Sequence, residues 1–186
     1  MKNLIKAASF FFALALVFSF YNPSKTKRLT ADKTKSYIKY YMYHSAHDWE
    51  GTCNNVSCNI TYNDSTKTIG GVGVAANVSC FNSANDSRDS HTLEVTEALK
   101  YPAVQFLSTS ITNQDTNLVV NGILTFHNVK KSISFKASKI ISKKEMKVSG
   151  MFSIKVTDYG MELPTLMMVP TEDLIKIAFV AVFKMN

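Results

Sequence analysis

The sequence predicts an all-β fold: an antiparallel sandwich or closed barrel of about eight strands with one short helix. Three observations lead to this prediction. From Ser36 onward, apolar residues recur at every second position, which is the period of a half-buried strand. Short polar connections such as Asn63–Asp64–Ser65 separate the alternating segments. One segment, residues 91–99, follows a helical pattern instead and ends shortly before Pro102.

The predicted strands differ in how their faces are composed. In residues 72–80 valine and alanine alternate with small residues, a pattern that an unfilled lumen and close packing explain equally well. The last strand is apolar on both faces, so we expect its outer face to be covered, with the helix as the candidate cover. In chain order the predicted strands are residues 37–44, 56–62, 72–80, 103–111, 118–126, 132–138, 146–156 and 173–184.

The first twenty residues predict a targeting segment rather than part of the barrel. Lys2 and Lys6 precede an apolar run at residues 7–20. This run is shorter than the about 20 residues that a transmembrane helix needs, so it predicts a secretory signal peptide at residues 1–20. Small residues do not define its cleavage site, and an uncleaved membrane anchor stays open. Residues 21–35 predict a basic polar linker, followed by a barrel domain at residues 36–186.

The formal net charge of +7 comes from the start of the chain. Residues 1–40 contain eight basic side chains and Asp32 alone, whereas residues 41–186 contain thirteen basic and thirteen acidic ones. A basic chain ordinarily suggests a nucleic-acid partner. Here the charge belongs to the targeting segment and the linker, so we predict no nucleic-acid binding. Contact of residues 25–39 with an anionic membrane surface stays open.

The three cysteines leave the disulfide pairing undetermined. In an exported protein two of them can form a disulfide. Cys53 and Cys58 are spaced for a staple within a hairpin, and either could instead pair with Cys80. One thiol is left over in each case. A zinc site needs more soft ligands at tighter spacing, so we predict none.

A polar cluster before the helix invites a catalytic interpretation. Arg88, Asp89 and His91 lie together, and an aspartate beside a histidine can orient a general base. A hydrolase that uses Asp89 and His91 is therefore one hypothesis. No motif supplies a nucleophile, so we favour a pair that fixes a loop, with Asp89 or Ser90 capping the helix. We predict no enzymatic activity and no catalytic residue.

A second polar cluster follows the first predicted strand, at His44, His47, Asp48 and Glu50. Two histidines with a carboxylate can hold zinc or copper. On a strand, however, positions 44 and 47 point to opposite faces. We therefore predict a polar cluster at a strand end, with no metal and no cofactor, and we interpret His127 as a hydrogen-bonded turn residue.

Several short motifs run through the domain in a consistent order. They are H-x-x-x-G at residues 47–51, R-D-x-H at 88–91, L-K-Y-P-A-V-Q-F at 99–106, G-I-L-T-F-H at 122–127 and T-D-Y-G-M at 157–161. Together they resemble the YceI-like family of exported, lipocalin-like proteins over about residues 36–184. The chain departs from the family pattern at Asn128, where glycine is usual, at Lys130 and Ser132, which replace threonine and proline, and at Val156, which replaces an arginine.

The resemblance implies a lipocalin-like antiparallel eight-stranded β-barrel, located in the periplasm or secreted. Its apolar lumen would hold a long polyisoprenoid or quinone-like lipid, for transport, storage or scavenging. Arg88, Asp89 and His91 would shape the loop and helix at one end and meet the lipid head group. Strand parity assigns these side chains to the lumen: Val74, Val78, Val104, Phe106, Leu124, Phe126, Phe135, Phe152, Ile154, Ile177 and Phe179.

A second hypothesis belongs to another class of function. The chain would be an exported stress-response or interaction module whose barrel is filled by side chains and holds no lipid. Its candidate contacts are the aromatic strand at residues 37–43 and the basic linker. A homodimer stays open under either hypothesis.

Overall fold

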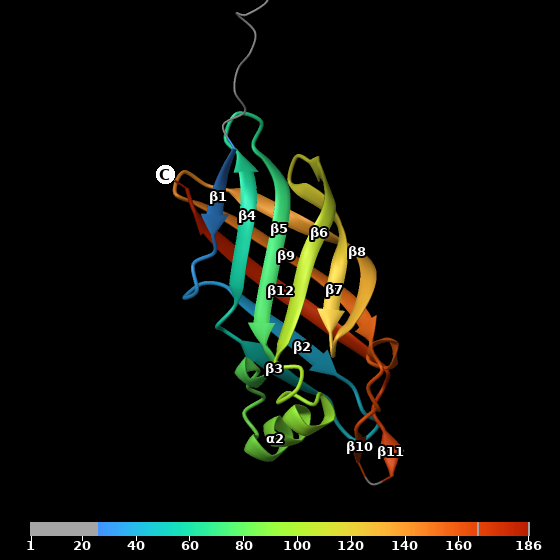
Figure 1. Ribbon diagram of the computed structural model, residues 1–186. Helices are drawn as coiled ribbons and strands as arrows, with labels where there is room; N and C mark the ends of the chain where they lie inside the picture. Colours follow the sequence, from blue (N-terminus) through green and yellow to red (C-terminus); the bar gives the residue numbers. More distant parts are fainter. Residues whose placement is uncertain (1–25, 167, 186) are drawn as a thin grey trace, which may run out of the picture.

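Ten strands form one antiparallel sheet that curls around a common interior (Figure 1). The computed structural model describes residues 26–166 and 168–185, so the signal peptide predicted at residues 1–20 lies outside the described residues. In sheet order the strands are β1 (Thr26–Thr30), β4 (Ser57–Asn63), β5 (Thr68–Asn77), β6 (Ala103–Gln114), β7 (Asn117–Phe126), β8 (Val129–Ile141), β9 (Glu145–Lys155), β12 (Leu174–Lys184), β2 (Tyr37–Met42) and β3 (Trp49–Cys53).

Shorter elements lie between these strands. β10 (Thr165–Leu166) and β11 (Val169–Pro170) pair with each other, and η2 (Val78–Cys80) and η3 (Thr157–Tyr159) are single 3₁₀ turns. α2 (Asp86–Val95) lies at the same end of the sheet as the β10–β11 hairpin (Figure 1). The predicted all-β fold with one short helix is confirmed.

Two sharp bends explain why the sheet has ten strands although eight were predicted. β1 pairs with β4, whereas β2 pairs with β12, so the turn between β1 and β2 carries the chain from one region of the sheet to another. Ala31 forms a bridge to Phe183 of β12, and its N–H donates to the Cys58 carbonyl at 2.9 Å. The chain bends again between β3 and β4, which pair with β2 and β1. Counting each bent pair as one strand gives eight.

The structure corrects two expectations at these bends. Part of the predicted linker is β1, which sequence periodicity missed because its only large aliphatic side chain is Leu29. The helix does not cover the outer face of the last strand, because it lies at one end of the sheet (Figure 1). The β1–β2 turn instead continues the edge pairing of β12 beyond β2: Ser36 Oγ accepts from the Val182 N–H at 3.0 Å, and Asp32 N–H donates to the Val182 carbonyl at 2.7 Å.

The helix also begins earlier than predicted. α2 starts at Asp86, with Asn85 as its N-cap, whose side chain accepts a hydrogen bond from the Arg88 N–H at 2.9 Å. Asp89 and Ser90 therefore lie inside the helix and do not cap it. Asparagine is a preferred N-cap residue. The sequence did not identify Asn85 as the cap, because several neighbouring polar side chains could also cap a helix.

A two-residue turn joins β7 to β8. Phe126 pairs with Val129, and His127 and Asn128 between them have φ values of 47° and 61°. Two successive positive φ values match the twist of the hairpin strands. Asparagine tolerates this conformation better than most residues, so Asn128 can serve where the family usually has glycine.

One end of the barrel is closed by packed side chains. Tyr62, Met146, Leu118 and Phe183 are all buried to 2 % exposure or less. They come from β4, β9, β7 and β12, and Met146 pairs with Phe183 in the sheet register. This cluster lies at the end of the barrel opposite α2 (Figure 1). We call the two ends the packed end and the α2 end.

Gly122 allows two neighbouring strands to approach closely. A Cβ added there would lie 2.5 Å from the Leu107 carbonyl oxygen and closer still to the Phe106 ring. We expect Gly122→Ala to lower the free energy of unfolding by about 1–3 kcal/mol, because the strands must separate. Gly73→Ala is the matched control, since a Cβ there meets only Leu107 Cδ1 at 3.9 Å. Equal urea midpoints for the two variants would contradict this account.

Candidate functional cavity

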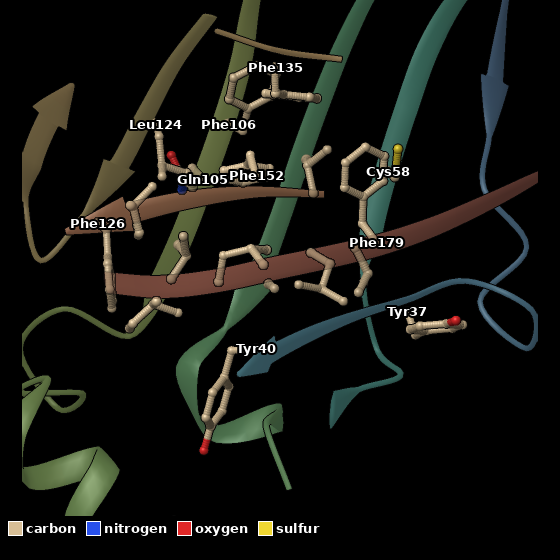
Figure 2. A pocket seen from close by; sticks show the side chains of 18 of the residues that line it. Tyr37, Tyr40, Cys58, Gln105, Phe106, Leu124, Phe126, Phe135, Phe152 and Phe179 are labelled. Carbon is tan, nitrogen blue, oxygen red and sulfur yellow. The ribbon is translucent and has the colours of Figure 1, made fainter. Parts of the chain in front are cut away.

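The curled sheet encloses an apolar cavity of about 250 Å³ (Figure 2). A dry apolar cavity of about 150 Å³ is already large enough to bind benzene. None of the described residues that line the cavity is charged. The cavity therefore provides an apolar environment for a ligand, and it contradicts the barrel filled by side chains that the interaction-module hypothesis requires.

Four phenylalanines from four strands form one wall of this cavity. Phe135 of β8 is their centre: its ring lies 5.4 Å from Phe106, 4.9 Å from Phe152 and 5.7 Å from Phe179, measured between centroids. Figure 2 shows Phe106, Phe135, Phe152 and Phe179 among the side chains that surround the open space. Phe135, Phe152 and Phe179 are only half-buried although they point inward. Inward-facing rings that keep exposed surface indicate a hollow interior.

All eleven side chains that strand parity assigned to the lumen line this cavity. Ten of them lie on β5, β6, β7, β8, β9 and β12, where the register decides which face of each strand points inward. The eleventh, Val78, lies in η2, because the strand predicted at residues 72–80 ends at Asn77. Their role as ligand contacts remains a prediction.

Sequence reasoning missed other lining residues. Ile38 and Met42 lie on the inner face of β2, and Cys58 and Ile60 on that of β4, where the period-two pattern could have found them. Trp49 of β3, Thr92 and Val95 of α2, and Thr96, which caps the end of α2, also line the cavity. No sequence signal indicated them, because the position of α2 over one end depends on the whole barrel.

Arg88, Asp89 and His91 lie on α2, and none of them lines the cavity directly. The Arg88 guanidinium lies 5.3 Å from the centroid of the Trp49 ring. Arg88 therefore contacts a residue that lines the cavity without lining the cavity itself. Asp89 accepts from the Ser83 N–H at 3.1 Å, and Arg88 Nη1 donates to Ser83 Oγ at 3.4 Å. The two residues thus fix the loop before α2 through Ser83. His91 is exposed and lies 3.5 Å from Glu94.

The ring of His47 lies 5.4 Å from that of Trp49, measured between centroids. His44 and His127 have hydrogen-bonding partners. His44 is buried: its Nδ1 accepts from the Ala46 N–H at 3.0 Å, and its Nε2 lies 3.1 Å from the Val169 carbonyl. His127 Nε2 lies 2.6 Å from Glu97 Oε2, and its Nδ1 lies 3.1 Å from the Tyr159 carbonyl. Both therefore fit the structural interpretation. Among the described residues no three histidine, cysteine or acidic side chains are grouped to hold a metal ion.

Tyr40 supplies a polar group at the α2 end of the cavity. Figure 2 shows its hydroxyl pointing away from the phenylalanine cluster. Burial raises the pKa of the Tyr40 hydroxyl, and a hydrogen bond with Thr92 of α2 partly opposes this shift. The hydroxyl therefore stays neutral at physiological pH. Tyr40, Thr92 and Thr96 bring neutral hydroxyl groups to this end of the cavity, whose other polar lining residues are Ser36, Tyr37 and Gln105.

One disulfide joins β3 to η2. Cys53 and Cys80 are bonded, with their Cα atoms 5.0 Å apart, so the Cys53–Cys58 staple does not form. Cys53 does not pair with Cys58 because Cys58 lies on β4, beyond the bend between β3 and β4, where its side chain lines the cavity. Cys53 is fully buried, and Cys58 remains as a buried free thiol.

The reactivity of the Cys58 thiol tests whether this side chain is buried in the cavity wall. Burial raises the pKa of its thiol to about 12. Because the thiolate is the reactive form, we expect Cys58 in the folded protein to react with iodoacetamide at pH 8 about a thousandfold more slowly than in urea, where its pKa is about 8.5. Mass spectrometry measures both rates on the same sample. Equal rates would show that the thiol is not buried.

The described part of the chain contains no helix that is both long and apolar enough to cross a membrane.

Solved structures of low sequence identity share this fold. Burkholderia cenocepacia BcnA has a TM-score of 0.74 at 16% identity, covering 82% of this chain and 98% of its own. A Saccharophagus degradans domain is named as a polyisoprenoid binding domain implicated in plant cell wall breakdown. It has a TM-score of 0.68 at 15% identity, and the match covers 85% of this chain and 98% of that domain. The Campylobacter jejuni YceI protein has a TM-score of 0.64 at 20% identity, and the match covers 73% of this chain and 84% of that protein. A search of curated proteins found no match.

A curled antiparallel sheet around an apolar cavity defines the class of lipocalin-like barrel proteins. Within this class, a model of the YceI-like domain matches residues 29–183. The chain belongs to the YceI-like family, and the resemblance drawn from its motifs is confirmed.

Proposed function

We propose that this chain is an exported binding protein that holds a long apolar amphiphile, a polyisoprenoid or a quinone-like lipid, in its cavity. It would transport, store or scavenge this lipid. The observation that carries the proposal is the hollow, uncharged interior with half-buried phenylalanines on its wall. The likeness of the fold to a polyisoprenoid binding domain supports it.

The physical basis is the burial of hydrocarbon. Each methylene group removed from water contributes about 0.8 kcal/mol, so a prenyl chain can bind tightly with few polar contacts. The chain would lie along the eleven predicted lumen residues. The neutral hydroxyls of Tyr40, Thr92 and Thr96 would meet the head group. Arg88 would act through Trp49, which it contacts, and His91, which is exposed and does not line the cavity, would meet only a head group that extends beyond the cavity.

Export is part of the same proposal. The start of the chain has the pattern of a signal peptide, and a disulfide joins Cys53 to Cys80. Disulfides persist in the periplasm and outside the cell and are rare in the cytosol.

Trp49 provides the readout for a binding experiment. It is the only tryptophan in the chain, and it lines the cavity. We expect prenyl alcohols of increasing length to change its fluorescence, with affinity rising at least about tenfold per isoprene unit until the cavity is full, and then levelling off. A response without any dependence on chain length would contradict the proposed function.

A further inference from the structure

The charges of the chain are distributed very unevenly over the structure. The strands β8 and β9 and the turn between them, residues 129–155, contain eight lysines and one acidic residue, Glu145. We call this segment the basic hairpin. Its formal charge of +7 exceeds the +4 of residues 26–185, which contain 18 basic and 14 acidic side chains. Residues 86–101 and 157–173, at the α2 end, contain eight acidic and two basic side chains. The basic hairpin begins and ends beside them with Lys130, Lys131 and Lys155, whereas its turn with Lys143 and Lys144 lies at the opposite end (Figure 1).

The lysines of the basic hairpin face water. All of them except Lys139 are exposed, and Glu145 is already paired with Lys35. Among the described residues, no ion pair joins any lysine of the basic hairpin to an acidic side chain. At longer range Lys155 interacts with Asp173 and Lys139 with Asp115, so most of the positive charge of the basic hairpin, but not all of it, is left without an acidic neighbour.

Large apolar side chains are exposed among these lysines. Ile140 is 58% exposed, Ile141 40% and Met151 51%. Ile140 lies opposite Lys147 in the sheet register, and the pair Ile140–Ile141 is followed by the turn with Lys143 and Lys144. A surface that mixes lysine with exposed aliphatic groups fits the boundary between water and lipid, where charged groups contact phosphates and apolar groups enter the headgroup layer.

The start of the described chain lies at the same end of the molecule as the turn of the basic hairpin (Figure 1). Lys27 of β1 pairs with Asp64 at 2.8 Å, and Lys139 Nζ donates to the carbonyl of Lys67, which follows in the same turn, at 2.6 Å. The 25 residues before Thr26, with the apolar run at 7–20, therefore join the domain beside this hairpin.

We propose that the turn end of the basic hairpin docks on an anionic lipid bilayer, with Ile140 and Ile141 in the headgroup layer and Lys143, Lys144 and Lys147 on lipid phosphates. A nucleic acid would meet the same charges but would make no use of the isoleucine pair. The acidic α2 end would be held away from the bilayer. This surface lies outside the cavity, so the proposal does not depend on the cavity ligand.

The test compares binding of the full chain to phosphatidylcholine vesicles with and without phosphatidylglycerol. The ratio of the two affinities removes any contribution of residues 7–20 that is common to both vesicles. We expect preference for the anionic vesicles, lost at high salt. Lys143→Gln with Lys144→Gln should reduce this preference about thirtyfold, because each lysine near an anionic surface contributes about fivefold. Ile140→Ser with Ile141→Ser should weaken binding to both kinds of vesicle.

Lys100→Glu is the matched control, because it changes the net charge by the same amount at the α2 end. It should leave the preference within about twofold of the unmodified protein. Equal binding to both vesicles, or an equal loss in Lys100→Glu, would overturn the proposal. Salt-dependent binding of duplex DNA without any preference for anionic vesicles would also overturn it, and would assign the hairpin to nucleic acid. Unchanged thermal unfolding in each variant shows that the effects come from the surface.

Discussion

Replacement of both Cys53 and Cys80 by alanine is expected to lower the free energy of unfolding by about 3–4 kcal/mol. The disulfide links residues 27 positions apart, and a crosslink of that length restricts the unfolded chain by about this amount. It also fixes β3 to η2, beside the loop that leads to α2. Urea unfolding of the variant and of the unmodified protein measures the difference.

Cys58→Ala is the control for this experiment, because it removes the free thiol and leaves the crosslink intact. Its loss should be smaller, about 1 kcal/mol, as for a small buried apolar group. A reducing agent should destabilise the unmodified protein and Cys58→Ala, but not the double variant. If reduction changed none of the three midpoints, the disulfide would have no part in stability.

Val74→Asp is expected to weaken binding of a long prenyl alcohol by at least about a hundredfold. Val74 lies on the cavity wall, opposite Cys58 on one side and Phe106 on the other. A carboxylate there must either stay ionised in apolar surroundings or raise its pKa, and both states disfavour hydrocarbon beside it. The Trp49 titration measures the affinity.

Ala75→Asp separates the effect of the cavity from that of the strand. The next residue along β5 points to the opposite face of the sheet, and Ala75 does not line the cavity. Its affinity should stay within about twofold of the unmodified protein. If both variants lost binding equally, the ligand would not lie where we place it.

Much of the fold follows from alternation of apolar side chains. The long strands β6 to β9 show this alternation clearly, because one face lines the interior and the other meets water. β12 is apolar on both faces and was predicted from its continuous apolar run. β1 and β3 were not predicted, since each is five residues long and contains charged or small residues such as Arg28, Glu50 and Gly51. A short segment offers too few positions to establish a period.

The candidate site was predictable in part for the same reason. Parity on the long strands identifies Phe135, Phe152 and Phe179 as inward-facing, but it gives no information on whether they meet or stand apart. The cavity depends on the curvature of the sheet, which the bends before Ser36 and after Cys53 help to set. The contact of Arg88 with Trp49 joins residues 39 positions apart and requires the complete fold.

The net charge of residues 41–186 gives no indication of the basic hairpin. Summed over residues 41–186 the charges cancel, which argued against a nucleic-acid partner. The eight lysines of residues 129–155 were present in the sequence, as were the acidic residues of the α2 end. The sum contains no information on position, and only the fold places the turn of the basic hairpin, with Lys143 and Lys144, at the end opposite α2 (Figure 1).

Native mass spectrometry of the protein, purified without added lipid from cells that export it, tests the central claim most directly. The account predicts a population heavier than the polypeptide by one lipid mass, which organic extraction removes and identifies as a prenyl chain or a quinone. Val74→Asp should lack this population, and Ala75→Asp should retain it. The mass of the bare polypeptide in every preparation, with no uptake of a prenyl alcohol afterwards, would contradict the account.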